Sequence, residues 1–148
     1  MEQIVPATQF DLRHTPLRDV NAALHAPDLT GDFVVRHPAG AHNVAVGLDA
    51  PVTVTVDGHV GYYAAGMNQR ADVVIHGNAG TGVAENMMSG TVWVKGDASQ
   101  SAGATAHGGL LVIEGNAAAR CGISMKGVDI VVTGSVGHMS GFMAQAGR

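Results

Sequence analysis

The sequence of 148 residues has little of what marks several large protein classes. A single cysteine, Cys121, excludes an internal disulfide framework and is typical of a reducing compartment. Charged residues make up 14% of the chain, the formal net charge is −4, and no Lys/Arg cluster is present, which argues against nucleic-acid binding. The first residues show no basic segment followed by an apolar core, and the sequence has no run of about 18 or more apolar residues. We therefore expect a soluble, cytoplasmic protein that contacts neither nucleic acid nor membrane.

Motifs for metal or nucleophilic chemistry are also missing. The eight histidines are scattered and form no His-x-His, His-Glu-x-x-His or Cys/His cluster, so we predict no metal site. Cys121 lies among small residues without a base beside it, which indicates a buried, unreactive thiol. The glycine-rich residues 77–82 lack the Gly-Lys-Ser/Thr of a phosphate loop and the spacing of a dinucleotide site. The sequence thus predicts neither catalytic nor cofactor-binding residues.

Glycine is abundant, and five of the glycines recur with a constant 19-residue period: Gly58, Gly77, Gly96, Gly115 and Gly134. Each ends a short run whose alternate positions are aliphatic, which is typical of the inward face of a strand. Polar residues stand immediately before and after each glycine, which indicates an outward position followed by a turn. One repeat cannot bury its own apolar face, so the repeats must stack. The sequence predicts a β-solenoid with 19-residue turns.

The residues before the repeats differ from them. Thr15 is expected to cap a short helix that opens at Pro16 and carries an apolar stripe of Leu17, Val20 and Leu24. We expect this helix to cover the open end of the solenoid, and docking on another chain is the alternative. Residues 33–51 are expected to form an atypical first turn in which Phe33 aligns with Val52.

This pattern divides the chain into residues 1–32, an N-terminal segment with a capping helix, and residues 33–148, the β-helix. The last turn begins at Gly137, and Arg148 stands where the next strand is due. We expect that either a partner covers this end or the chain continues in a longer protein.

Methionines are concentrated between the expected strands, at positions 67, 87, 88, 125, 139 and 143. Methionine adapts to irregular contacts, which suits both core filling and the binding of a partner. Met87 and Met88 are our candidates for a partner surface.

Residues 77–90, GNAGTGVAENMMSG, resemble the GXGXG repeat. That repeat forms the C-terminal domain of the glutamate synthase large subunit and occurs in a subunit of formylmethanofuran dehydrogenase. Residues 83–90 and 17–24 are also similar to a narrower group of stand-alone glutamate-synthase-like subunits, which includes the middle subunit of N-methylglutamate synthase. The resemblance covers residues 15–148 and implies an all-β fold, a single-stranded right-handed β-helix preceded by a short helix.

The resemblance also implies a function. In this family the β-helix holds other domains in place and is not known to supply catalytic side chains. It implies a non-catalytic subunit of a hetero-oligomeric complex with two partners, a flavoprotein synthase subunit with FMN and an iron–sulfur cluster and a class II glutamine amidotransferase-like subunit. The implied reaction is the conversion of methylamine and glutamate to N-methylglutamate and ammonia. A subunit of a glutamate synthase variant or of formylmethanofuran dehydrogenase is the alternative.

An independent solenoid enzyme is the alternative from another class. Hexapeptide-repeat acyltransferases have turns of about 18 residues with an aliphatic residue at every sixth position, and a 19-residue period does not fit that pattern. The Gly-Gly-x-Gly-x-Asp repeats of calcium-binding solenoids are missing as well.

Overall fold

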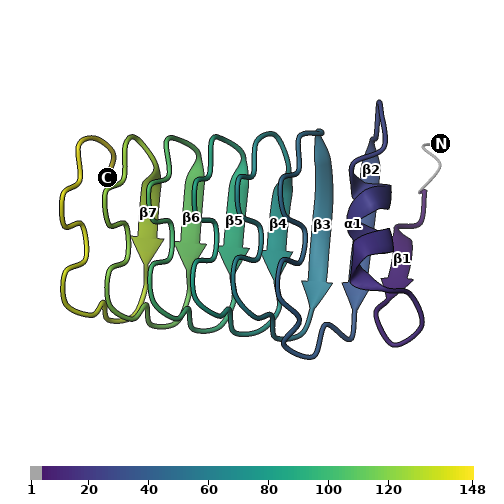
Figure 1. The fold of residues 1–148 in the computed structure, drawn as a ribbon, viewed down its shortest axis with the longest axis horizontal. Helices are drawn as coiled ribbons and strands as arrows, with labels where there is room; N and C mark the ends of the chain where they lie inside the picture. Colours follow the sequence, from purple (N-terminus) through teal and green to yellow (C-terminus); the bar gives the residue numbers. More distant parts are fainter. Residues whose placement is uncertain (1–4) are drawn as a thin grey trace.

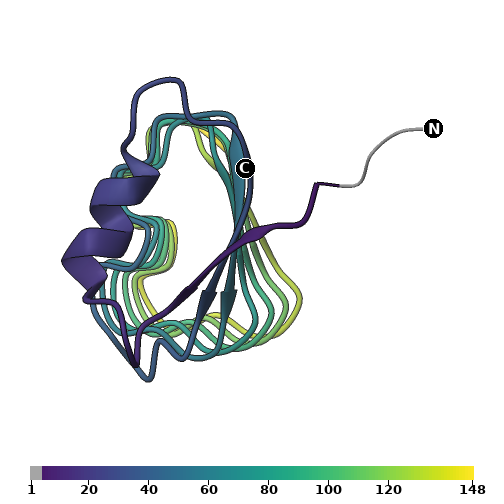
Figure 2. The same cartoon turned by 90° about the vertical axis from the view of Figure 1, so that its right-hand side faces the viewer.

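A computed structural model describes residues 5–148, which form a β-solenoid (Figure 1). Seven parallel strands form one sheet in chain order: β1 (Thr8–Asp11), β2 (Gly31–Arg36), β3 (Val52–Asp57), β4 (Asp72–Ile75), β5 (Thr91–Val94), β6 (Leu110–Ile113) and β7 (Asp129–Val132). The only helix among the described residues, α1 (Leu17–Leu24), lies between β1 and β2. Viewed from the N-terminal end, the chain circles clockwise as it recedes (Figure 2), so the solenoid is right-handed.

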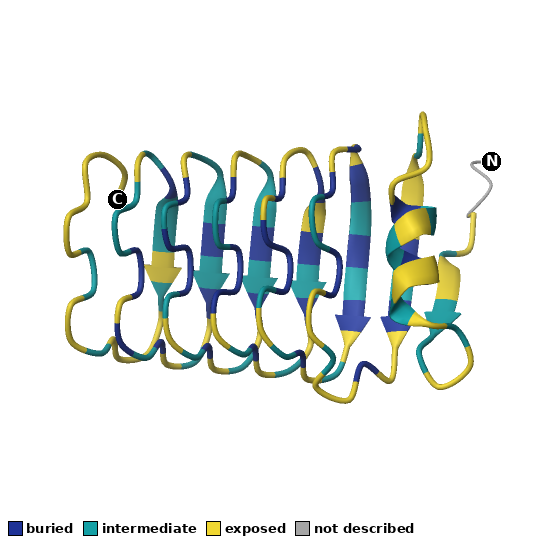
Figure 3. Ribbon diagram, viewed as in Figure 1, coloured by how far each residue is buried: buried dark blue, intermediate teal, exposed yellow. Residues whose placement is uncertain are grey.

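From β3 to β7 the strands pair in a constant 19-residue register. The aligned inward positions include Val54, Val73, Val92 and Leu111, each paired with the next. These side chains are buried, and the residues between them are partly exposed, which gives the alternating colours along β3 to β6 in Figure 3. The predicted 19-residue turn is confirmed.

The first turn departs from the expected register. Phe33 pairs with Val54, two positions beyond the expected partner, so the alignment of Phe33 with Val52 is wrong. A shift of two positions leaves every side chain on the same face of its strand, so the apolar alternation does not distinguish the two registers. The observed register buries Phe33 and Val35 against the inward column, and the connection to β3 takes up the extra length.

The core fills the inside of the coil and is lined mainly by small side chains opposite the sheet. Val60, Ala79, Ala98 and Ala117 form one buried column, and their backbones are joined by parallel bridges. Cys121 lies in another such column and is buried, as predicted. Small residues let the opposite walls of the coil approach closely enough for their side chains to pack without voids.

The wall opposite the sheet has an alternating backbone. In each of the last five turns three alternate residues have positive φ, for example Gly82 at 79°, Ala84 at 56° and Asn86 at 58°. Their amides point alternately to the two neighbouring turns: Gly82 N donates to Gln100 O of the following turn, and Ala84 N donates to Ala64 O of the preceding one. We call this wall the return wall. Its segments are hydrogen-bonded from turn to turn although they are not strands.

Helix α1 lies at the N-terminal end of the return wall (Figure 2). Asn21 Nδ2 donates to Asn43 O at 2.8 Å, Asn21 Oδ1 accepts from Ala45 N at 3.0 Å, and His25 Nε2 lies 3.0 Å from Gly47 O. Val20 and Leu24 are buried beneath the helix. Side chains of α1 therefore satisfy backbone groups at the edge of the return wall and cover the core there.

The expected helix cap is wrong. The N-cap residue is Pro16, with φ −58° and ψ 143°, and no side chain caps the helix. The Thr15 amide instead donates to Asp11 O in the turn that leads into the helix. This turn determines how the chain enters α1, so Thr15 lies one residue before the N-cap position.

Candidate functional site

One corner of the solenoid carries a ladder of polar side chains. The residue after each of the first four repeat glycines accepts a hydrogen bond from the backbone amide at the same position of the next turn. The four acceptor–donor pairs are His59 Nδ1 with Asn78 N at 2.8 Å, Asn78 Oδ1 with Asp97 N at 2.9 Å, Asp97 Oδ1 with Asn116 N at 2.7 Å, and Asn116 Oδ1 with Ser135 N at 2.8 Å. The sequence indicated only a turn at these positions. Their role is to join consecutive turns.

Gly96, Gly115 and Gly134 lie where this ladder leaves no room for a side chain. A Cβ atom at Gly115 would lie 2.7 Å from Gly96 O and would also meet Asp97 Oδ1. The same holds at Gly96, where the Cβ atom would meet Gly77 O at 2.8 Å and Asn78 Oδ1. These glycines are therefore structural: the absence of a side chain allows the close approach of consecutive turns, and the 19-residue spacing is the length of one turn.

The outward face of the sheet carries a row of mostly apolar side chains across six strands. Each member pairs with the next in the sheet register, and we call this set the outer row: Val34, Thr55, Val74, Trp93, Val112 and Val131. Lys95 Nζ lies 4.3 Å from the centre of the Trp93 ring, and Val131 is 51% exposed. Polar positions flank most of the row on both sides. This arrangement of an apolar centre with a polar rim resembles a protein interface.

The sequence reasoning missed the outer row, although a signal for it was present. The strands Asp72–Ile75, Thr91–Val94 and Leu110–Ile113 read as nearly continuous apolar runs, DVVI, TVWV and LLVI. Such runs are typical of parallel strands that are covered on both faces. The apolar outward positions of these runs therefore indicate that the outer face is covered as well.

The two methionines that we expected to form a partner surface differ in burial: Met87 lies in the core and Met88 lies at the surface. Met87 is fully buried, so its assignment to a surface is wrong: the chain direction at this corner turns its side chain into the core. Met88 is 46% exposed, and its amide donates to Asn68 O, the carbonyl next to Met67, which is 43% exposed. Met67 and Met88 thus belong to neighbouring turns at one corner, which we call the methionine corner.

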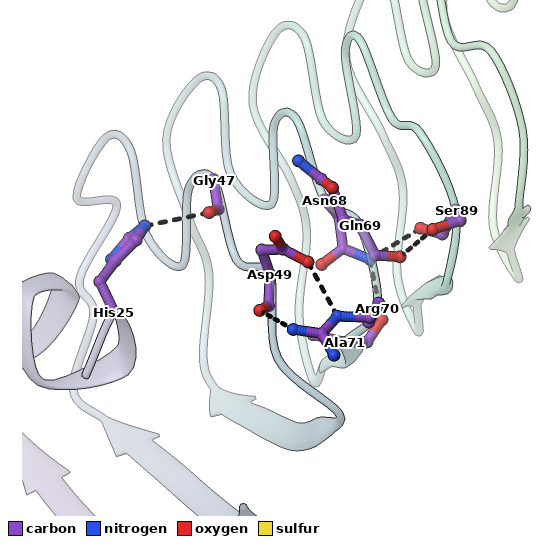
Figure 4. A network of polar contacts seen from close by, with 8 residues as sticks. All are labelled: His25, Gly47, Asp49, Asn68, Gln69, Arg70, Ala71 and Ser89. Carbon is purple, nitrogen blue, oxygen red and sulfur yellow. Dashed lines mark hydrogen bonds and ion pairs between the residues drawn. The ribbon is translucent and has the colours of Figure 1, made fainter. Parts of the chain in front are cut away.

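A hollow of about 480 Å³ lies between the segment after α1 and residues 49–51. Arg70 Nε donates to Asp49 Oδ1 at 2.8 Å, and Arg70 Nη2 donates to the Asp49 carbonyl oxygen at 2.6 Å (Figure 4). The ring nitrogens of His25 both face backbone carbonyls, of Asn21 and of Gly47. These three side chains are thus occupied in holding the chain together around the hollow.

A second hollow, of about 280 Å³, lies at the C-terminal end of the solenoid and is lined by Cys121, Met125, Ile130, Val132 and Val136 among others. Burial raises the pKa of the Cys121 thiol, so the sulfur is held in its protonated, unreactive form. This agrees with the prediction of an unreactive cysteine. The neighbouring Val136, Met139 and Phe142 are exposed.

The other titratable groups are mainly structural. Burial raises the pKa of Glu85, and a two-bond contact with Arg13 holds the pKa of Asp11 well below its usual range. Lys95 Nζ and Glu114 Oε1 form an exposed ion pair at 3.5 Å. Within residues 5–148 no three His, Cys, Asp or Glu side chains converge as a metal site. No helix in this part of the chain is long and apolar enough to cross a membrane.

These features define a right-handed β-solenoid with 19-residue turns and a ladder of polar side chains at one corner. Exposed apolar side chains lie in the outer row, at the methionine corner and at the C-terminal end. Among curated proteins the chain is similar to Protein GlxC of Rhizobium meliloti (strain 1021), with 62% identity over 62 residues. The match covers 38% of this chain and 26% of GlxC, so it spans about a quarter of the length of that relative. No family model and no solved structure matches the chain.

Proposed function

We propose that this chain is a non-catalytic assembly subunit of a glutamate-synthase-type enzyme complex. The observation that carries the proposal is the match to GlxC, at 62% identity over 62 residues, in a chain built from 19-residue glycine repeats. The match is consistent with the glutamate-synthase-like family that the repeats resemble. The finer proposal, N-methylglutamate synthase, rests on the resemblance of residues 17–24 and 83–90.

The geometry suits a subunit that holds others in place. Consecutive turns are joined by the sheet, by the return wall and by the polar ladder, so side chains on the surface keep fixed positions relative to one another. The methionine corner offers two flexible, exposed apolar side chains to a partner, and methionine is common at such surfaces. In this proposal the partners are a flavoprotein synthase subunit, which carries FMN and an iron–sulfur cluster, and a class II amidotransferase-like subunit.

Adjacent methionines provide a matched test. A tagged full-length chain is purified from its host, and native mass, visible absorption and amine-dependent activity of the isolated assembly are measured. We expect a yellow-brown assembly that contains a flavoprotein. Met88→Ser should reduce recovery of the flavoprotein several-fold while Tm stays unchanged, because its side chain is exposed.

Met87→Ser serves as the control in the same experiment. Its side chain is fully buried, so this variant should lower the stability of the chain by about 2–5 kcal/mol. The Met87→Ser chains that remain folded should still recover as much flavoprotein as the wild-type chain does. A colourless chain recovered without other subunits, or turnover of a substrate by the chain alone, would contradict the proposed function.

A further inference from the structure

The outer row is a second exposed apolar surface, separate from the methionine corner. Parallel sheets are usually covered on both faces, and here the inner face is covered by the core while the outer face is not. Near the middle of the row the Trp93 indole Nε1 is shielded from solvent but has no hydrogen-bond partner among the described residues. Tryptophan in such a setting is a frequent centre of binding energy in protein interfaces.

The charges beside the outer row differ between its two sides. The outward positions at the strand starts contain acids and no base: Asp32, Thr53, Asp72, Thr91, Leu110 and Asp129. The outward positions at the strand ends contain both acids and bases: Asp11, Arg36, Asp57, His76, Lys95, Glu114 and Thr133. In a copy whose strands run in the opposite direction, each acid at a strand start would face a strand-end position that is not acidic.

We propose that the outer row is the contact face of a symmetric dimer of this chain, packed sheet to sheet with the strands of the two copies antiparallel. A two-fold axis along the outer row sets each strand opposite its own copy. Asp32 of one copy then faces Arg36 of the other, and Asp72 faces His76. In this arrangement no charged group at a strand start of one copy faces a group of the same charge at a strand end of the other. The two Trp93 side chains lie near the axis.

A two-fold axis along the strands gives a second arrangement, in which the strands of the two copies are parallel. An axis between β4 and β5 sets β2 opposite β7 and β3 opposite β6, so Asp32 would face Asp129 and Asp57 would face Glu114. Like charges placed directly opposite one another in an interface are repulsive. Other positions of this axis avoid these two contacts, but in none of them does Asp32 face Arg36. The charge exchange described below therefore distinguishes the two orientations.

The size of the face sets the expected strength of the dimer. Six strands spaced about 4.8 Å apart extend roughly 24 Å, and the outward positions with their side chains extend roughly 17 Å along the strands. The face therefore covers about 400 Å² on each copy, or about 800 Å² in total, which is below the size of stable specific interfaces and suits only a weak, transient one. We expect a reversible dimer with a dissociation constant in the micromolar range.

The test uses the full-length chain alone, at increasing concentration, in sedimentation equilibrium. The wild-type mass should rise from that of a 15.1 kDa monomer to twice this value. Trp93→Lys should raise the dissociation constant at least tenfold, and Met88→Ser, on a different surface, should leave it unchanged. Circular dichroism checks that each variant remains folded.

A charge exchange tests the orientation of the two copies. Asp32→Arg alone should weaken the dimer, because the new side chain faces Arg36 of the other copy. Arg36→Asp alone should weaken it too, and the double variant should restore wild-type affinity. Both positions are exposed. Arg36→Asp places a third acid between Asp11 and Asp57 and should lower stability modestly, so circular dichroism is used to confirm that each variant is folded before its affinity is compared.

Two results would overturn the dimer. One is a monomer at every concentration; the other is a dimer that neither Trp93→Lys nor the single charge variants weaken. If Trp93→Lys left the mass unchanged but abolished recovery of the flavoprotein, the outer row would belong to that partner instead. Self-association of the isolated chain and capture of the flavoprotein are measured separately, so this inference and the proposed function fail independently.

Discussion

Gly115 illustrates how a single residue in this fold is determined by the turn before it. The missing side chain leaves space for Gly96 O and for Asp97 Oδ1, and Asp97 accepts the hydrogen bond of the Asn116 amide. The φ angle of Gly115 is not in the left-handed region, so close approach alone explains the glycine. A glycine at the same place in every 19-residue repeat is thus the mark of one turn lying directly on another.

We predict that Gly115→Ala lowers the free energy of unfolding by about 1–3 kcal/mol, as overpacking of a tight site does. The added methyl group must push apart two consecutive turns at the polar ladder. Thr133→Ala, at an exposed position of the sheet, should change stability by less than about 0.5 kcal/mol. Urea unfolding of both variants measures the difference, and equal stability of the two would contradict the role assigned to Gly115.

At the scale of elements, α1 takes the place of a further turn at the N-terminal edge of the return wall, because it satisfies the backbone groups that such a turn would bond to. Neighbouring segments of the return wall are joined by hydrogen bonds between backbone amides and carbonyls. The first segment lies against α1, whose own backbone amides bond within the helix. Side chains therefore replace backbone groups: Asn21 bonds to both Asn43 and Ala45, and His25 reaches Gly47. The helix can cover this end because it supplies side-chain partners and buries Leu24.

Asn21→Ala should destabilise the chain by about 1–3 kcal/mol, because it removes two hydrogen bonds at the edge of the return wall. Arg18→Ala lies on the same helix with its side chain in solvent, and it should have almost no effect. Thermal unfolding of the two variants is the measurement. If both gave the same Tm as the wild type, the edge of the return wall would not depend on Asn21.

The strands could be predicted from the sequence because the alternation along each strand coincides with the 19-residue repeat. Val73 and Ile75 share a face in any strand, and their spacing from Val92 and Val94 gives the stacking. The return wall could not be predicted, because its positive φ angles fall on residues as different as Tyr63, Ala84 and Arg120. Turn-to-turn hydrogen bonds impose this backbone, and residue type does not record it.

The surfaces were harder to predict than the strands for a related reason. Met87 and Met88 are identical residues in adjacent positions, and only the direction of the chain at the corner decides that the first is buried and the second exposed. The outer row could have been found, since Val74, Trp93 and Val112 are apolar at outward positions of the predicted strands.

At the scale of the whole molecule, each turn contacts mainly the turn before it and the turn after it. The strand pairings run in order from β1 to β7, with no strand crossing over another. The stability of such a molecule is close to a sum over turns and their contacts, so its terminal turns open more readily than its central ones.

Hydrogen exchange should therefore show a gradient of protection along the chain. Amides in β4, β5 and β6 should exchange most slowly, and amides in the turn that contains Met139 and Phe142, whose side chains are exposed, should exchange fastest. Mass spectrometry of peptides from each turn gives the measurement. Equal protection in all turns, lost in one cooperative step, would show that the solenoid unfolds as a single unit instead.

Because the register is constant from β3 to β7, the length of this solenoid changes in equal steps of one turn. Removing or adding one complete 19-residue repeat would leave every glycine beneath its neighbour and every rung of the ladder joined. The molecule would only become shorter or longer, by one strand spacing of about 4.8 Å. A lineage could thus adjust the distance between two bound neighbours in equal steps by duplicating or losing repeats, without redesigning the surface that either neighbour recognises.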